Sequence, residues 1–248
     1  MRIDLNCDLG EGAGHDAELM PLVTSANIAC GAHAGDEATM RATVELALRH
    51  DVAIGAHPGF ADREHFGRRE LPVTPEEVFQ TVLAQIRVLQ RIAQAVGARV
   101  GHVKLHGALY NLAARDVAIA EAAAYAVRDA GPDLIWFALA GSAHVAAGRE
   151  CGLTVANEVF ADRTYQADGS LTLRSRADAL ITDEGVAVAQ VLRMIRERKV
   201  RATNGADVAV AADTVCVHGD GAHAVAFARR LRTELAAAGV AVQKFARE

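Results

Sequence analysis

Short apolar runs alternate along this chain with longer segments in which apolar residues recur every three or four positions. The short runs predict seven strands, at residues 2–6, 25–30, 52–56, 100–105, 134–139, 153–159 and 213–217. The longer segments predict helices at residues 37–49, 74–97, 117–130, 184–198 and 222–238. Strands that alternate with helices are typical of a parallel sheet. Seven such units favour an irregular seven-stranded (β/α) barrel of the TIM-like kind, with an open doubly wound sheet as the alternative.

Helix boundaries are best defined at residues 74–97. Thr74, Pro75 and Glu77 match a capping box with proline at the first helical position. Asp36 and Asp116 are expected to cap the helices that follow them. No shift in composition divides the chain, so residues 1–248 are expected to form one barrel domain.

Two long loops interrupt the alternation of strands and helices. They cover residues 58–73 and 161–183, and loops of this length inside a compact domain are often functional. A smaller feature, Asn204-Gly205 between two short apolar runs, predicts a hairpin.

Alternation within the strands separates an apolar face from a polar one. Side chains point to opposite faces at successive positions, and the apolar set must pack under the helices. The polar set is then expected to face the barrel interior or its mouth: Asp4, Asn6, Asp8, Asn27, His33, His57, His102, Lys104, His106, Thr214, Cys216 and His218. An interior lysine needs an acidic partner or an anionic ligand, and Asp4, Asp8 and Glu158 are the candidate partners of Lys104.

Four histidines fall where predicted strands end, namely His33, His57, His106 and His218. Asp8, Glu158 and Asp220 lie at the same level. In a parallel α/β fold, ligands bind at the carboxyl ends of the strands. A single histidine at such a position is more often structural, but so many buried polar groups are costly to keep for packing alone. We therefore expect Asp8, His33, His57, His106, Glu158 and His218 to gather around one cavity at one end of the barrel.

A metal site is a weaker interpretation of the same residues. His33, His57 and Asp8 have the ligand types of a hydrolytic zinc site. His102 and His106 have a tempting spacing, but on a strand they lie about 13 Å apart and cannot chelate one ion. We expect no required metal; if one is bound, Asp8, His33 and His57 are its expected ligands.

Composition excludes several other classes of protein. Net charge is −5 and aromatic residues make up 4% of the 248 residues, with no run of Lys or Arg, so nucleic acid is not an expected partner. No apolar stretch reaches the ~20 residues of a membrane span, and the N-terminus lacks a signal-peptide pattern. The four cysteines form no CxxC pair, are expected to be small buried residues, and suit the cytoplasm.

Six motifs, in this order, resemble the family of 5-oxoprolinase A subunits, also known as the LamB/YcsF or lactam-utilization family. They are IDLNCDLGEG, SANIACGAHAGD, VAIGAHPGF, HVKLHGALYN, EVFADRTYQADGSL and TVCVHGDG, and the resemblance runs from Ile3 past Arg232. One departure is Leu105, where the family usually has proline. Its position on the apolar face predicts a changed local backbone and an intact site.

This resemblance implies a barrel of the glycoside hydrolase/deacetylase type. It also implies ATP-dependent hydrolytic opening of 5-oxoproline (pyroglutamate) to L-glutamate, together with two partner subunits, B and C. The use of ATP is chemically reasonable, because an amine held beside its own carboxyl group easily re-forms the lactam ring. Such proximity lowers the activation barrier by roughly 7–11 kcal/mol. The Gly-rich DLGEGAG segment lacks the GxxxxGK[ST] phosphate loop, so the partners are expected to do much of the work with ATP.

Roles within the site follow from the chemistry of each residue type. The expected catalytic residues are Asp8, His57, Lys104, His106 and His218. The expected substrate-binding residues are Asn6, Glu11, His33, Asn111, Glu158, Arg163, Tyr165 and Asp220. Asp8 or His57 would act as general base, and Lys104 with His106 would hold the substrate carboxylate or the oxyanion.

The remaining residues have more specific expected roles. Glu158, Arg163 and Tyr165 are expected to close over the ring, and His218 with Asp220 to form an acid and its orienting partner. Two rival functions remain open: a metal-dependent deacetylase or amidohydrolase on the same barrel, and a non-catalytic scaffold for partner subunits. The polar interior disfavours the scaffold, which would not need it.

Overall fold

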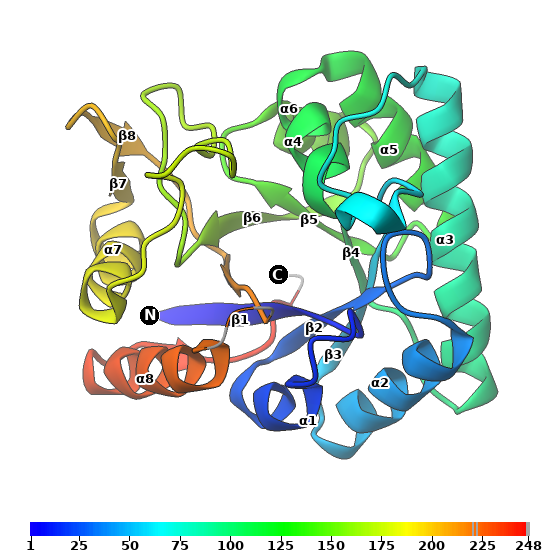
Figure 1. Ribbon diagram of the computed structural model, residues 1–248, viewed down its shortest axis with the longest axis horizontal. Helices are drawn as coiled ribbons and strands as arrows, with labels where there is room; N and C mark the ends of the chain where they lie inside the picture. Colours follow the sequence, from blue (N-terminus) through cyan, green and yellow to red (C-terminus); the bar gives the residue numbers. More distant parts are fainter. Residues whose placement is uncertain (220, 222, 247–248) are drawn as a thin grey trace.

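Seven parallel strands close into a barrel in the computed structural model, which describes residues 1–219, 221 and 223–246 (Figure 1). The barrel strands are β1 (Arg2–Leu9), β2 (Ser25–Ala29), β3 (Ala53–His57), β4 (His102–Lys104), β5 (Ile135–Leu139), β6 (Thr154–Phe160) and β9 (Thr214–Val217). Closure occurs at β9, where Thr214 pairs with Glu158 of β6 on one side and with Asp4 of β1 on the other. The prediction of a seven-stranded barrel is therefore confirmed, and the open sheet is excluded.

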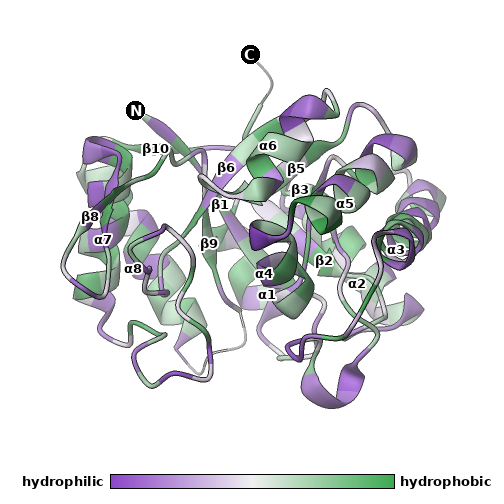
Figure 2. Cartoon of the chain, turned by 90° about the horizontal axis from the view of Figure 1, so that it is seen from above, coloured by the Kyte–Doolittle hydropathy of each residue, from purple (hydrophilic) through white to green (hydrophobic). Residues whose placement is uncertain are grey.

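Helices surround the barrel (Figure 1). They are α1 (Asp16–Leu19), α2 (Glu37–Arg49), α3 (Pro75–Ala95), α4 (Gly107–Arg115), α5 (Val117–Ala130), α6 (Ala143–Glu150), α7 (Glu184–Glu197) and α8 (Ala224–Ala237). Figure 2 shows hydrophilic stretches on the outer turns of α3 and α7. Among the described residues, none of these helices combines the length and apolar character needed to cross a bilayer.

Capping contacts confirm the predicted helix starts. Thr74 Oγ1 accepts from the Glu77 backbone N–H at 3.3 Å, while Glu77 Oε2 accepts from the Thr74 N–H at 2.7 Å. Asp36 and Asp116 cap α2 and α5 through the same type of side-chain contact. The helices α1, α4 and α6 were not predicted, because they span only four, nine and eight residues, too few for a clear helical period.

Three short strands are additional to the seven strands of the barrel. The predicted hairpin is confirmed as β7 (Lys199–Arg201) and β8 (Asp207–Ala209), which pair antiparallel. β10 (Ala241–Val242) was not predicted and adds to the start of β1. Two 3₁₀ turns, at Met20–Leu22 and Arg63–His65, complete the regular structure.

The predicted alternation of inward and outward side chains along the strands is confirmed by the contacts inside the barrel. Val103 and Val215 pack into the apolar layer between strands and helices, whereas their neighbours point inward. Asn27 on β2 links two interior side chains: its amide donates to Asn6 Oδ1 at 2.8 Å, and its own oxygen lies 2.9 Å from His102 Nε2. The barrel interior is thus a hydrogen-bonded polar network, and the apolar core surrounds it.

Gly55 on β3 makes room for the His102 ring. A Cβ at this position would lie 2.0 Å from His102 Nε2. Gly55→Ala is expected to lower the free energy of unfolding by about 1–3 kcal/mol, the usual cost of overpacking. Urea denaturation measures the change. Gly101→Ala is the matched control, because its Cβ would meet only the Ile54 carbonyl at 3.8 Å; equal stability of the two variants would refute the prediction.

Candidate functional site

A cavity of about 240 Å³ opens at the carboxyl ends of the strands. The sequence-predicted residues in its wall are Asp8, Glu11, His57, Lys104, His106, Asn111, Arg163 and His218. Ligands bind at this end of (β/α) barrels. Six gathered residues were expected; four of them line the cavity, while His33 lies behind His106 and Glu158 lies deeper in the barrel.

Lys104 forms the floor of this cavity as a buried cation. Its Nζ lies 2.8 Å from Asp8 Oδ1 and 3.0 Å from Glu158 Oε1. Burial by itself would lower the pKa of Lys104, but the charges of Asp8 and Glu158 outweigh this effect and raise it. Two of its three candidate partners are therefore in place. The third, Asp4, sits a layer below, where it accepts from Thr24, Ser25 and Thr214.

Glu158 does not close over the cavity as expected, because it lies on β6 inside the barrel and is completely buried. Its Oε1 accepts from Asn6 Nδ2 at 3.0 Å, and its Oε2 accepts from the Tyr110 hydroxyl at 2.7 Å. Asn6 is buried in the same layer and also accepts from Lys104 Nζ at 3.3 Å. Both residues thus hold Lys104 in place from below.

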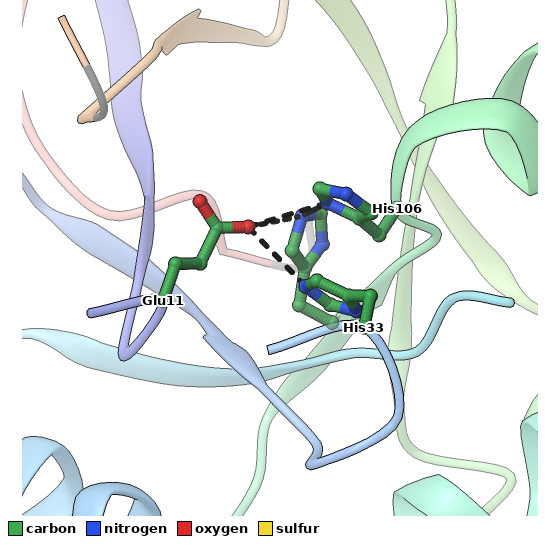
Figure 3. A group of neighbouring side chains, drawn as sticks. Glu11, His33 and His106 are labelled. Atoms are coloured by element: carbon green, nitrogen blue, oxygen red, sulfur yellow. Dashed lines mark hydrogen bonds and ion pairs between the residues drawn. The ribbon is translucent and has the colours of Figure 1, made fainter. Parts of the chain in front are cut away.

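Glu11 connects the histidines at the mouth. It follows β1, and its Oε1 lies 3.3 Å from both His33 Nε2 and His106 Nδ1 and 3.9 Å from His57 Nε2. Figure 3 shows the Glu11 carboxylate directed at the His33 and His106 rings. These two rings stack with centroids 3.7 Å apart and planes within 1°.

Electrostatics in this cluster favour a charged carboxylate beside neutral rings. Burial lowers the pKa of His33 to about 4, and burial also lowers the pKa of His106. Burial would raise the pKa of Glu11, but the His106 and His33 rings beside it outweigh burial and lower it. Glu11 is thus ionised at neutral pH.

Main-chain carbonyls fix the tautomers of His57 and His106. His57 Nδ1 lies 2.8 Å from the Lys104 carbonyl, and His106 Nε2 lies 2.8 Å from the Phe66 carbonyl. A carbonyl only accepts, so both of these ring nitrogens carry hydrogen and donate. Phe66 belongs to the predicted functional loop at residues 58–73, which therefore forms part of the site.

His218, at the end of β9, pairs with a residue that sequence reasoning missed. Its Nδ1 lies 2.9 Å from both carboxylate oxygens of Asp162. Burial would raise the pKa of Asp162, but His218 outweighs it and lowers it. The expected partner, Asp220, lies outside the described residues. The sequence signal for Asp162 was its place two residues after the end of β6.

The long loop at residues 161–183 is anchored by residues that were expected to touch substrate. Tyr165 is completely buried, and its hydroxyl accepts from the Phe160 N–H at 2.7 Å, so it holds the loop and is not among the residues that line the cavity. Arg163 lines the cavity, but its guanidinium donates to the Thr172 and Ala179 carbonyls. Asn111, on α4, lies in the wall, and its Nδ2 donates to the Gly107 carbonyl at 3.1 Å.

The buried cysteines are expected to be dispensable as nucleophiles. Burial raises the pKa of Cys30 to about 12 and raises that of Cys7 and Cys216 well above the usual range, so all three remain thiols. Cys30→Ala should keep the rate of the reaction that this chain catalyses within a factor of a few of the parent rate, and Cys7→Ala should do the same. Loss of turnover in a folded variant, checked by circular dichroism, would show that a cysteine takes part in the reaction.

Among the described residues, two groups have the spacing to hold a metal, and neither is the expected set: one consists of Asp8, Cys216 and His218, and the other includes Glu11. Ligand atoms of Glu11, His33, His57 and His106 all lie within 4.8 Å of one another. Asp8 does not join this group, although its Oδ2 lies 3.3 Å from His57 Nε2. Glu11 was missed as a ligand because it lies in the loop beyond β1, where strand parity no longer predicts direction.

Leu105 stands directly before His106, where the family that the motifs resemble usually has proline. Its side chain is buried in the apolar layer, as its parity predicted. The His106 N–H donates to the Pro58 carbonyl at 2.8 Å, which ties the end of β4 to the loop at residues 58–73.

Comparison with known proteins gives consistent matches over nearly the whole chain. Curated relatives named as the A subunit of 5-oxoprolinase are 57% identical in Geobacillus kaustophilus, over 99% of this chain and 98% of that protein, and 58% identical in Shouchella clausii, over 97% of each. A crystal structure of a lactam utilization protein from Thermus thermophilus superposes with a TM-score of 0.91 at 46% identity and covers 99% of this chain and 100% of that one.

More distant structures share the fold alone. A family 4 carbohydrate esterase from Streptomyces lividans superposes with a TM-score of 0.50 at 12% identity, over 99% of this chain and 93% of that one. The family model described as LamB/YcsF matches residues 3–248. This chain therefore belongs to the LamB/YcsF family, among whose members are proteins named as the A subunit of 5-oxoprolinase.

Proposed function

We propose that this chain opens the ring of 5-oxoproline to L-glutamate by hydrolysis, as one subunit of an ATP-dependent 5-oxoprolinase with two partner subunits. One observation carries the proposal: a lysine held cationic by two carboxylates forms the floor of a small cavity whose wall also holds Asp8, His57 and His106. Close relatives named as 5-oxoprolinase A subunits support the choice of substrate.

The cavity suits a small anion. At about 240 Å³ it is smaller than typical sites for drug-sized ligands. Its wall includes Lys104 and four arginines, Arg68, Arg115, Arg163 and Arg174, and these cations outnumber its carboxylates, Asp8, Glu11 and Glu70. 5-Oxoproline offers one carboxylate and one amide oxygen, and both are acceptors that these cations can hold.

Ring opening needs a base for water and a donor for the developing oxyanion. Asp8 or His57 takes a proton from water, whose oxygen then bonds to the lactam carbon. Lys104 faces the cavity and stabilises the oxyanion, and His106, whose Nε2 donates to the Phe66 carbonyl, lines the wall beside it. As the C–N bond breaks, the ring nitrogen takes a proton and becomes the amine of glutamate. His218, held by Asp162 at the cavity wall, is placed to supply that proton.

ATP serves the complex by making ring opening irreversible. Transfer of a phosphoryl group from ATP to the lactam oxygen by the partner subunits would give ADP and an activated ring. Water would then add to the ring carbon in this cavity, breakage of the C–N bond would leave a glutamyl phosphate, and hydrolysis of that phosphate would release glutamate and inorganic phosphate. The arginines at the mouth fit a phosphorylated ring as well as a carboxylate. In this division of labour, residues of this chain bind the activated ring, position water and move protons.

Release of glutamate tests the proposed function. We expect no release from 5-oxoproline by this chain alone, with or without ATP, and steady release once both partner subunits and ATP are added. If the complete mixture released no glutamate, or if the two partners with ATP released it equally well without this chain, the proposed function would be wrong.

A metal-dependent deacetylase is the second candidate function. The cluster of Glu11, His57 and His106 favours it, since two imidazoles and one carboxylate also serve in zinc hydrolases. Release of acetate from an N-acetylated sugar by this chain alone would support this candidate. The proposed function predicts none.

A further inference from the structure

The histidines at the cavity mouth present two lone pairs to each other. His57 Nε2 and His106 Nδ1 lie 2.9 Å apart. Each neutral ring has one N–H, and each donates it to a main-chain carbonyl. The two nitrogens that face each other are therefore both acceptors. Two acceptors at this distance repel each other unless a positive particle lies beside them.

Carboxylates on both sides of this histidine pair increase the need for a positive charge there. The Glu11 carboxylate lies 3.3 Å from His106 Nδ1, and the Asp8 carboxylate lies 3.3 Å from His57 Nε2. All four residues are at least half-buried and line the cavity. Lys104 does not meet the need, because its Nζ is already held by Asp8 and Glu158 on the floor.

The separations among the donor atoms lie on both sides of those around a small metal ion, within about 0.4 Å. Ligand bonds of about 2.0–2.2 Å to zinc place tetrahedral ligand atoms about 3.3–3.6 Å from one another. Here the three separations among Glu11 Oε1, His57 Nε2 and His106 Nδ1 are 2.9, 3.3 and 3.9 Å. The His57 and His106 rings are nearly perpendicular, at 88°, so both lone pairs can converge on one point.

His33 belongs to the cluster without being a ligand. Its ring is parallel to that of His106, so an ion in the plane of one ring lies outside the plane of the other. Its Nε2 lies 3.3 Å from Glu11 Oε1 and is placed to donate to it. His33 therefore orients the carboxylate, as the Lys104 and Phe66 carbonyls orient the other two ligands.

We propose that Glu11, His57 and His106 bind one divalent transition-metal ion of the zinc class. The ligand set of two imidazoles and a carboxylate suits zinc and leaves one position open toward the cavity. Binding of the ion stands independently of the reaction. Its role rests on the proposed function: the open position holds the attacking water, and Asp8, beside His57, takes the proton because His57 Nε2 is occupied.

Zinc binding by the purified full-length chain tests the proposal. After removal of metal with a chelator, titration with Zn²⁺ at neutral pH should show one tight site. His57→Ala and His106→Ala should each weaken zinc binding by about 100-fold or more. His33→Ala should weaken it by about 10–100-fold, the range for a partner that orients a ligand. The matched control His65→Ala removes a histidine that pairs with Asp62, and it should bind zinc as the parent does.

A measurement on the unchanged chain covers the case in which a variant fails to fold. X-ray absorption of the zinc-loaded parent should show two imidazoles and oxygen ligands. A parent chain that binds zinc no better than His57→Ala would overturn the proposal and leave a shared proton between the two rings. An absorption spectrum with sulfur ligands would overturn it as well, by placing the ion at a cysteine. Neither result would bear on whether the complex releases glutamate.

Discussion

Lys104→Met is expected to lower glutamate release by the assembled complex by about 10²–10³-fold. Methionine keeps the apolar stem of the side chain and removes the charge. Lys104 is the buried cation on the cavity floor, and loss of a donor directed at developing negative charge typically costs about 2.7–4 kcal/mol. The rate is measured with both partner subunits and saturating ATP. A folded variant that released glutamate within a factor of a few of the parent would make Lys104 a structural ion-pair residue.

Stability has to be separated from this catalytic effect. Without Lys104, Asp8 and Glu158 remain as buried carboxylates, and breaking a buried ion pair costs about 3–5 kcal/mol. Adding Glu158→Gln removes one of these charges, and the glutamine oxygen can still accept from the Tyr110 hydroxyl. The double variant is expected to regain part of the lost stability in urea denaturation while its glutamate release remains as low as in Lys104→Met.

Asp8→Asn is expected to lower glutamate release by about 10²–10⁴-fold, the usual contribution of a general base. Asparagine keeps an oxygen that accepts from Asn27 and Lys104, so the loss is chiefly of charge and basicity. Asp36→Asn is the matched control, because it makes the same change at the N-cap of α2, where asparagine also caps well, and it should leave the rate unchanged. Equal rates of glutamate release for the two variants would show that Asp8 takes no part in the reaction.

The pKa of Asp8 also predicts how stability depends on pH. Burial would raise this pKa, but His57 and Lys104 outweigh it, and the folded value lies well below the ordinary value of 3.8. A depressed carboxyl pKa contributes stability that is present above the unfolded value and is lost as the pH falls toward the folded one. Asp8→Asn should therefore flatten the loss of stability below about pH 4, as measured by urea denaturation across pH.

Strand parity predicted most of the barrel interior correctly. Lys104, Asn6 and Asn27 point inward as expected, because each lies within a strand where direction alternates strictly. The ends of the strands also predicted that His57, His106 and His218 would meet at one cavity. The alternation of side chains along a strand is therefore sufficient to predict their direction where the backbone is regular.

Prediction failed where the chain leaves the strands. Glu11 was expected at the site but not as a metal ligand, and Asp162 was not expected at all. Both sit in loops, and their partners, His106 and His218, come from segments far away along the chain. Tyr165 was expected near the substrate, but its hydroxyl instead holds the backbone of Phe160. Contacts of this kind depend on how loops fold over the barrel, and neither periodicity nor spacing encodes that.

Glutamate release by the complete complex, reconstituted with parent or Asp8→Asn chain, tests most directly whether the lactam ring is opened in this cavity. Both mixtures contain the same partner subunits, ATP and 5-oxoproline. We predict steady release with the parent chain and release reduced by at least about 100-fold with Asp8→Asn. Equal release from the two mixtures, or from the partners alone, would show that the ring opens elsewhere.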